Sequence, residues 1–120
     1  MAGKEDRGIP IADANTTTWK EHPRVKGILL KPLLTAAENP LANLNLVQVP
    51  VGGVVPRHIH AKEVETVCIL AGQAILVLGE EERPFGVGQV VAIPMGLEHS
   101  LINQGDVPIE MFTFFTPPLQ

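Results

Sequence analysis

The sequence predicts an all-β domain built as a sandwich or barrel, and two observations support this prediction. Eleven glycines and eleven prolines are spread along 120 residues, so they divide the chain into short pieces. Many of these pieces are rich in Val, Ile, Leu, Phe and Thr, which favour strands. Helices of ordinary length have little room, and several short strands at near-regular spacing are typical of a sandwich or barrel.

The expected strands follow one another along the chain. They cover 25–34, 44–51, 55–60, 63–71, 73–79, 89–93, 98–103 and 108–116. Residues 35–43 are predicted to hold a helical turn, because Thr35 can cap it and Pro40 ends or kinks it. Residues 1–20 are expected to form an N-terminal arm and residues 21–120 a single barrel domain, a size that one hydrophobic core can support.

Charge and hydropathy exclude several classes of partner. The formal net charge is -4 and the sequence pI is near 5.5, so there is no basic stripe for a nucleic acid backbone. No apolar run approaches the roughly 18 residues of a membrane span, and the polar start has no apolar segment after it. The single cysteine, Cys68, cannot form an intrachain disulfide, which fits a reducing compartment. We therefore expect a cytoplasmic protein without nucleic acid or membrane partners.

The composition also predicts self-association. Apolar residues make up 45% of the chain and charged residues 18%, so apolar surface is expected to remain after the core is filled. A homodimer is a natural way to cover such surface, and the cluster of Phe112, Phe114 and Phe115 is a candidate for it.

Three histidines and a glutamate, His58, His60, Glu65 and His99, stand at regular intervals among glycines and prolines. Imidazole and carboxylate groups together suit a borderline divalent metal. Three nitrogens and one oxygen leave coordination positions open for water, substrate or dioxygen, which is typical of a catalytic or ligand-binding site. A closed structural zinc site is the weaker interpretation, because such sites are usually rich in cysteine.

Strand alternation makes this metal site testable. His58 and His60 are two residues apart, so on a strand both imidazoles project from one face. The face of Glu65 continues through Val67 and Ile69, which turns Cys68 to the opposite side as an inert cysteine. Glu63 shares the strand face of Glu65, but the intervals to the neighbouring motif residues favour Glu65.

The second group of residues contains its own turn signals. Pro94 is expected in the turn before a strand, and Gly96 supplies a backbone shape that other residues resist. The strand that follows places His99, Leu101 and Asn103 on one face. Asn103 is predicted to hydrogen-bond a neighbouring loop or to orient the site, since a neutral amide is a poor ligand where imidazole competes.

These two groups match the two motifs of the cupins, a family that the chain resembles without a gap. The matching positions are Gly52, His58, His60, Glu65 and Gly72 in the first motif and Gly88, Pro94, Gly96, His99 and Asn103 in the second. The short interval 73–87 is similar to that of compact microbial single-domain members. The resemblance implies a small double-stranded antiparallel β-barrel, a jelly roll, and implies His58, His60, Glu65 and His99 as metal ligands.

The expected cofactor is one divalent transition metal per chain, Mn, Fe, Ni, Cu, Co or Zn, with no further cofactor. Inward neighbours Val67, Ile69 and Leu101 are apolar, and the last strand adds either Met111, Thr113 and Phe115 or Glu110, Phe112 and Phe114. No interior strand position offers an obvious inward Lys or Arg, so a phosphosugar substrate is disfavoured. His22 is expected at the surface.

Three functions stay open. The first is a dioxygenase for a small, largely apolar or aromatic oxygen-bearing molecule, in which Glu65 is the catalytic candidate because it can leave the metal or accept a proton. The second is Lewis-acid isomerisation or hydration. The third is a metal-dependent small-molecule sensor without enzymatic activity.

Overall fold

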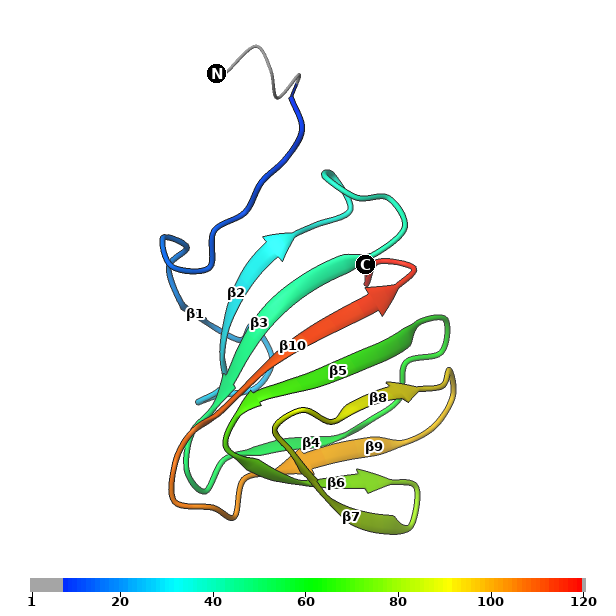
Figure 1. The fold of residues 1–120 in the computed structure, drawn as a ribbon. Helices are drawn as coiled ribbons and strands as arrows, with labels where there is room; N and C mark the ends of the chain where they lie inside the picture. Colours follow the sequence, from blue (N-terminus) through cyan, green and yellow to red (C-terminus); the bar gives the residue numbers. More distant parts are fainter. Residues whose placement is uncertain (1–7, 120) are drawn as a thin grey trace.

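The computed structural model describes residues 8–119, which form ten strands in two antiparallel sheets (Figure 1). The larger sheet has the strand order β1 (Lys20–Glu21), β2 (Leu29–Leu34), β3 (Asn43–Val49), β10 (Ile109–Thr116), β5 (Val64–Ala71) and β8 (Val90–Ile93). The smaller sheet has the order β4 (Val54–His58), β9 (His99–Ile102), β6 (Gln73–Leu78) and β7 (Glu81–Gly86). The described residues contain no helix, so the all-β prediction is confirmed.

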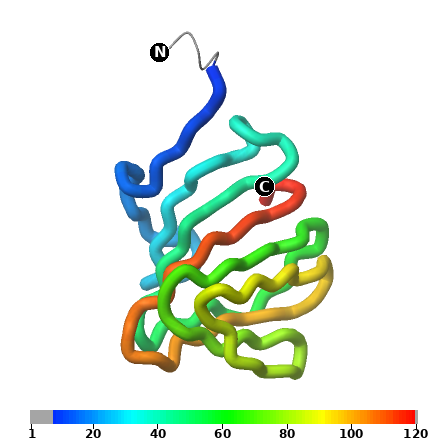
Figure 2. Tube along the Cα trace, viewed as in Figure 1, coloured from blue at the N-terminus to red at the C-terminus, as the bar shows by residue number. Residues whose placement is uncertain are grey.

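From β3 onward the chain alternates between the two sheets. Strand β4 lies in the smaller sheet, β5 in the larger, β6 and β7 in the smaller, β8 in the larger, β9 in the smaller and β10 in the larger. The path can be followed in Figure 2, where the two layers wind around a common interior. This is the double-stranded barrel that the sequence predicts.

Gly72 marks one of the crossings between the sheets, between β5 and β6. Its φ is +86°, in the left-handed region that side chains disfavour. A Cβ atom at this position would lie 2.7 Å from the carbonyl oxygen of Pro108, which is backbone and cannot move aside easily. The crossing therefore requires glycine for two independent reasons.

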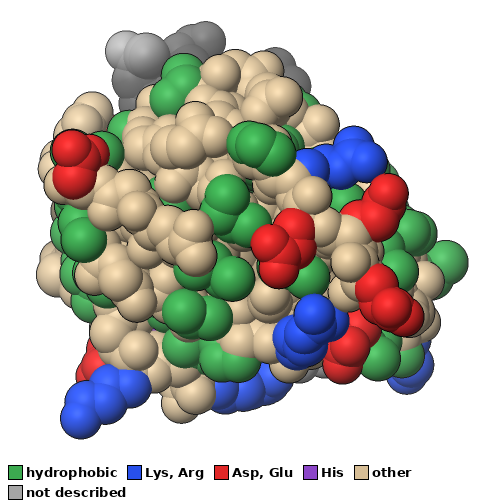
Figure 3. Space-filling model, turned by 90° about the horizontal axis from the view of Figure 1, so that it is seen from below, with side chains coloured by type: hydrophobic (Ala, Val, Ile, Leu, Met, Phe, Trp, Pro, Cys, Tyr) green, Lys and Arg blue, Asp and Glu red, His purple; other side chains and the backbone are tan. Residues whose placement is uncertain are grey.

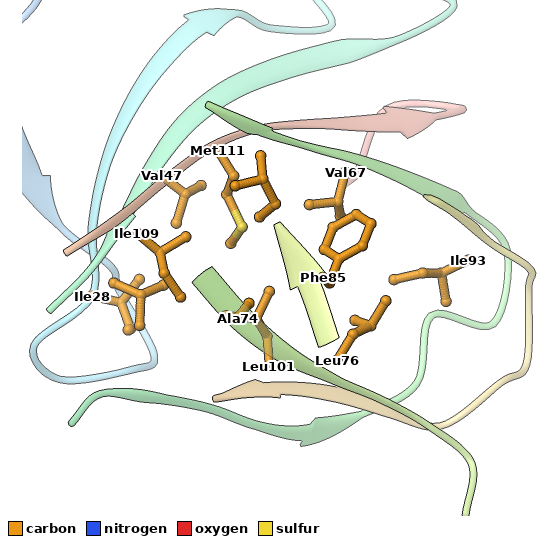
Figure 4. Close-up of a cluster of buried hydrophobic side chains, with 12 residues drawn as sticks. Ile28, Val47, Val67, Ala74, Leu76, Phe85, Ile93, Leu101, Ile109 and Met111 are labelled. Atoms are coloured by element: carbon orange, nitrogen blue, oxygen red, sulfur yellow. The ribbon is translucent and has the colours of Figure 1, made fainter. Parts of the chain in front are cut away.

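The hydrophobic core lies between the two sheets and follows strand alternation. On β5, Val67 and Ile69 are buried, whereas Leu70 is exposed. On β10 the buried set is Met111, Thr113 and Phe115, which decides between the two alternatives that the sequence left open. Figure 4 shows side chains from both sheets, Met111 and Val67 on one side and Leu76 and Leu101 on the other, pointing toward one another.

The predicted strands correspond to β2, β3, β4, β5, β6, β8, β9 and β10, with ends that differ by a few residues. The predicted turn after β2 is present as a single turn, in which the amides of Glu38 and Asn39 donate to the carbonyl of Thr35. The Thr35 hydroxyl accepts a hydrogen bond from the amide of Ala37, as expected of a capping residue. Strands β1 and β7 were not predicted.

The predicted N-terminal arm is described only from residue 8 onward, since residues 1–7, like Gln120, lie outside the described residues. Its last residue, Lys20, begins β1 and pairs with Leu30. Nearby, the Lys31 ammonium donates to the carbonyl of Ala14 and lies 4.6 Å from the centroid of the Trp19 ring. The division into an arm and a barrel remains a prediction. Within residues 8–119 no helix is long and apolar enough to cross a membrane.

Candidate metal centre

Two of the histidines come from the end of β4 and the loop that follows it. His58 is the last residue of β4, and His60 lies two residues further on, so both imidazoles point to the same side. The Nδ1 atom of His58 donates to the carbonyl of Pro56 at 2.7 Å. This bond assigns the ring proton to Nδ1 and leaves the lone pair of Nε2 free for a metal.

His99 and Glu65 complete the group from neighbouring strands. His99 begins β9 and is paired with His58 in the register of the smaller sheet. Its Nδ1 atom donates to the carbonyl of Leu97 at 2.8 Å, which again leaves Nε2 as the free ring nitrogen. Glu65, on β5, reaches the histidines from the larger sheet.

The ligand atoms of His58, His60, Glu65 and His99 all lie within 4.8 Å of one another, an arrangement that could hold a metal ion. Oε1 of Glu65 is 3.1 Å from Nε2 of His99 and 3.6 Å from Nε2 of His60. Nε2 of His60 is buried and, among residues 8–119, has no hydrogen-bond partner. A buried nitrogen without a partner is costly, so its presence beside a carboxylate fits the chemistry of a metal ligand.

Electrostatics keep Glu65 ionised. Burial disfavours the charged form and raises the pKa of Glu65, but the imidazoles of His60 and His99 outweigh burial and lower that pKa from 4.5 to about 2. Burial also lowers the pKa of His58, and the neighbouring His99 lowers it further, against opposing effects of Pro56 and Glu65. The site thus presents a carboxylate and a neutral His58, the protonation states that bind metal.

A cavity of about 490 Å³, named here the main cavity, opens beside the cluster. His58, His60 and Glu65 form part of its wall. The ring of Phe115 packs edge-on against His60, with 5.0 Å between the ring centroids. The rest of the wall is mostly apolar, from strands β2, β3, β4 and β10, with polar side chains at Asn43, Asn45 and Thr113. From below, no histidine of the described residues is visible on the surface (Figure 3).

His22 was expected at the surface, but it is half-buried and lines the main cavity. Its Nδ1 atom accepts hydrogen bonds from the amides of Arg24 and Val25, and burial, Arg24 and His58 lower its pKa. The bend that carries it is anchored by the buried Ile28, whose carbonyl accepts from the amide of His22. The Glu21-His22-Pro23 sequence signalled a turn, but not that the turn folds over the site.

Two arginines also border the main cavity, although the interior strand positions hold none. Arg24 lies on the same bend as His22. Arg57, on β4, is exposed and donates to the carbonyl of Gly79 and to the carboxylate of Glu98 at 3.2 Å. The guanidinium of Arg57 is therefore already bound to Gly79 and Glu98 at the surface.

The remaining sequence-predicted residues fall outside the cluster. Glu63 is buried but is not a member of the metal-binding group. Cys68 lies on the β5 face opposite to Val67 and Ile69, as expected. Asn103 is 1% exposed, and its amide nitrogen donates to the carbonyls of Val49, Pro50 and Val107. The side chain of Asn103 thus holds together the segment after β3 and the loop before β10.

The turn before β9 also follows the prediction. Pro94 precedes the turn, and Gly96 has a φ of +81°. The amide of Gly96 donates to the carbonyl of His60 at 2.9 Å. This bond ties the turn before His99 to the loop that carries His60.

Comparison with known proteins identifies the family. Residues 45–115 match the cupin domain family, and the chain therefore belongs to the cupins. Among curated proteins, a mannose-1-phosphate guanylyltransferase from Klebsiella pneumoniae is 32% identical over 74 residues, which cover 62% of this chain. The match covers only 16% of that relative's length.

Solved structures share the fold at low sequence identity. A predicted oxalate decarboxylase from Thermotoga maritima superposes with a TM-score of 0.81 at 21% identity, covering 89% of this chain and 98% of the other. A sugar phosphate isomerase of the cupin superfamily from Silicibacter pomeroyi gives a TM-score of 0.75 at 21% identity, covering 89% and 75%. These similarities establish the fold.

Proposed function

We propose that the chain binds one divalent transition metal through His58, His60, Glu65 and His99 and acts as a dioxygenase-type enzyme. The observation that carries the proposal is the partnerless, buried Nε2 of His60 beside an ionised carboxylate. A bound redox-active metal would supply positions for an organic oxygen atom and for dioxygen.

The residues of the chain have separate roles in this proposal. The backbone carbonyls of Pro56 and Leu97 fix the ring orientation of His58 and His99 and so keep two Nε2 atoms directed at one point. Glu65 is the group that exchanges a proton with the substrate, since its carboxylate lines the main cavity.

The walls of the main cavity favour a small, largely apolar or aromatic molecule that carries oxygen. Met111 and Phe115 supply apolar contact, and Asn45 and Thr113, which are paired across β3 and β10, supply polar groups on the same wall. A cavity of about 490 Å³ is within the range of small-molecule sites.

Oxygen consumption tests the proposal. Purified protein is loaded separately with Mn, Fe, Ni, Cu and Co, and with at least one of these redox-active metals it is expected to consume dioxygen in the presence of one member of a panel of small phenols, diketones and thiols. An oxygen electrode measures the rate, and the matched control is the same protein after treatment with a chelator. Turnover that is unchanged under anaerobic conditions would contradict the dioxygenase assignment.

A Lewis-acid isomerase or hydratase is the second candidate, favoured by the position of Arg24 beside the main cavity. Anionic substrates are bound by such groups, and the similar structures include a predicted decarboxylase and a sugar phosphate isomerase. Anaerobic turnover would select this class, whereas tight binding without turnover would select a sensor.

We propose the cytoplasm as the location of the protein.

A homodimer is proposed through the outer face of the larger sheet. Phe112 and Phe114 lie there, half-buried, beside the half-buried Leu44 on β3, whereas Phe115 is buried and faces the interior of the barrel. Val90, on β8 of the same sheet, is 61% exposed. Association would remove this apolar surface from water, and light scattering at micromolar concentration is expected to give twice the mass of the chain. A monomeric mass would contradict the proposal.

A further inference from the structure

A second, smaller cavity borders the histidine cluster. It has a volume of about 30 Å³ and is named here the inner cavity. Its apolar lining comes from both sheets and consists of Val55, Val67, Leu76, Ile93, Leu101 and Met111. Five of these, all except Val55, are labelled in Figure 4, where their side chains gather between the sheets.

The four candidate ligands lie where the two cavities meet, together with Val55 and Met111, which line both. His60 lines only the main cavity, and His99 lines only the inner cavity. His58 and Glu65 line both. A metal held by these four side chains would therefore border two chambers of different size and different chemistry.

The inner cavity is poorly suited to water. A buried water needs two to four polar partners, and apolar cavities of this kind stay dry. The polar residues of its wall are His58, Glu65, His99 and Ser100. Oε1 of Glu65 already faces Nε2 of His99 at 3.1 Å, and the Nδ1 atoms of both histidines are bonded to backbone carbonyls. When His58, Glu65 and His99 bind a metal, Ser100 is the only other polar residue in the wall that could bind a water molecule.

The volume matches a very small guest. A cavity needs roughly 10–15 Å³ to admit one water-sized molecule, so about 30 Å³ admits a diatomic molecule but not an organic substrate. We infer that the inner cavity is the dioxygen pocket of the site, and that the organic substrate approaches the metal from the main cavity. This inference rests on the proposed dioxygenase function and assigns each reactant to its own side of the metal.

Xenon, an apolar atom that enters dry cavities, is the probe for this assignment. Crystals of the full chain, loaded with zinc and pressurised with xenon, are expected to show one xenon peak among Val67, Leu76, Ile93 and Leu101. Val67→Ile adds a single methyl group to the wall and is expected to remove the peak. Val90→Ile makes the same change at a residue that is 61% exposed and is expected to leave the peak in place.

A wild-type crystal without xenon at this position, or with ordered water there, would overturn the inference without any variant. In the metal-loaded enzyme, Val67→Ile is further expected to raise the Michaelis constant for dioxygen several-fold and to leave that for the organic substrate unchanged. If the enzyme consumes dioxygen but the crystals show no xenon site, the assignment of the inner cavity is overturned and the dioxygenase function is not. A xenon site combined with anaerobic turnover would instead overturn the dioxygenase function and, with it, dioxygen as the guest.

Discussion

Replacing His99 with alanine is expected to reduce the bound metal from about one ion per chain to near zero. His99 supplies an Nε2 atom whose direction is set by the bond from Nδ1 to Leu97, and its side chain is the most buried of the three histidines of the cluster. Loss of an outer partner of a ligand typically weakens metal binding by about 10–100-fold, so loss of a ligand itself is expected to exceed that range. Elemental analysis after dialysis against a defined metal concentration measures the effect.

His22→Ala is the matched control for this substitution. His22 lines the main cavity and is half-buried, but it does not belong to the cluster that could hold a metal ion. It is therefore expected to retain about one metal per chain. Equal metal contents in the two variants, or a wild-type protein without metal, would show that the cluster is not a metal centre.

The second large effect is a loss of stability in acid that depends on Glu65. In the metal-free protein the pKa of Glu65 falls from 4.5 to about 2 on folding. The folded state therefore favours the carboxylate, and this contribution is complete above pH 4.5 and is lost as the pH falls toward 2. The difference corresponds to about 3 kcal/mol of unfolding free energy.

Glu65→Gln keeps the shape of the side chain but removes its titration. The difference in unfolding free energy between wild type and this variant is expected to shrink steadily between pH 4.5 and pH 2, as measured by urea unfolding of chelator-treated protein. Glu63→Gln, which makes the same change at a buried carboxyl group outside the cluster, is the matched control. A constant difference for Glu65→Gln across this range would contradict the prediction.

The cluster of candidate metal ligands could be predicted from the sequence, because its residues sit at fixed intervals on or beside short strands. His60 follows His58 by two positions, with only Ile59 between them, so alternation alone places both imidazoles on one side. The turn glycine Gly96 sets the direction of the strand that begins at His99. These are local properties, and the structure brings all of the predicted side chains together.

Strand β7, in contrast, was missed for a physical reason. Its sequence, Glu81–Gly86, contains charged residues and Pro84, which argue against a strand in the middle of a sheet. In the structure β7 is the edge strand of the smaller sheet and pairs only with β6, where a proline and charged side chains are tolerated. Its position at the edge is a property of the whole topology and is not written in the local sequence.

His22 was misplaced for a similar reason. Its neighbours Glu21 and Pro23 predict an exposed turn, and a turn is present. The environment of the imidazole depends on where the bend lies relative to β4, more than thirty residues later in the chain. The second cavity also escaped prediction, since it results from how Val67, Leu76 and Ile93 meet across the two sheets.

The origin of the ligands has a mechanical consequence. His58 and His99 belong to the smaller sheet and Glu65 to the larger, so an ion bound by them would join the two layers at one point. Metal binding would then add to the free energy of unfolding, because a ligand that binds only the folded chain stabilises it by an amount that rises with the logarithm of its affinity. The ion would act as a cross-link between the walls of the barrel, and its loss would leave this end of the barrel held by side-chain packing and by the contact between Glu65 and His99.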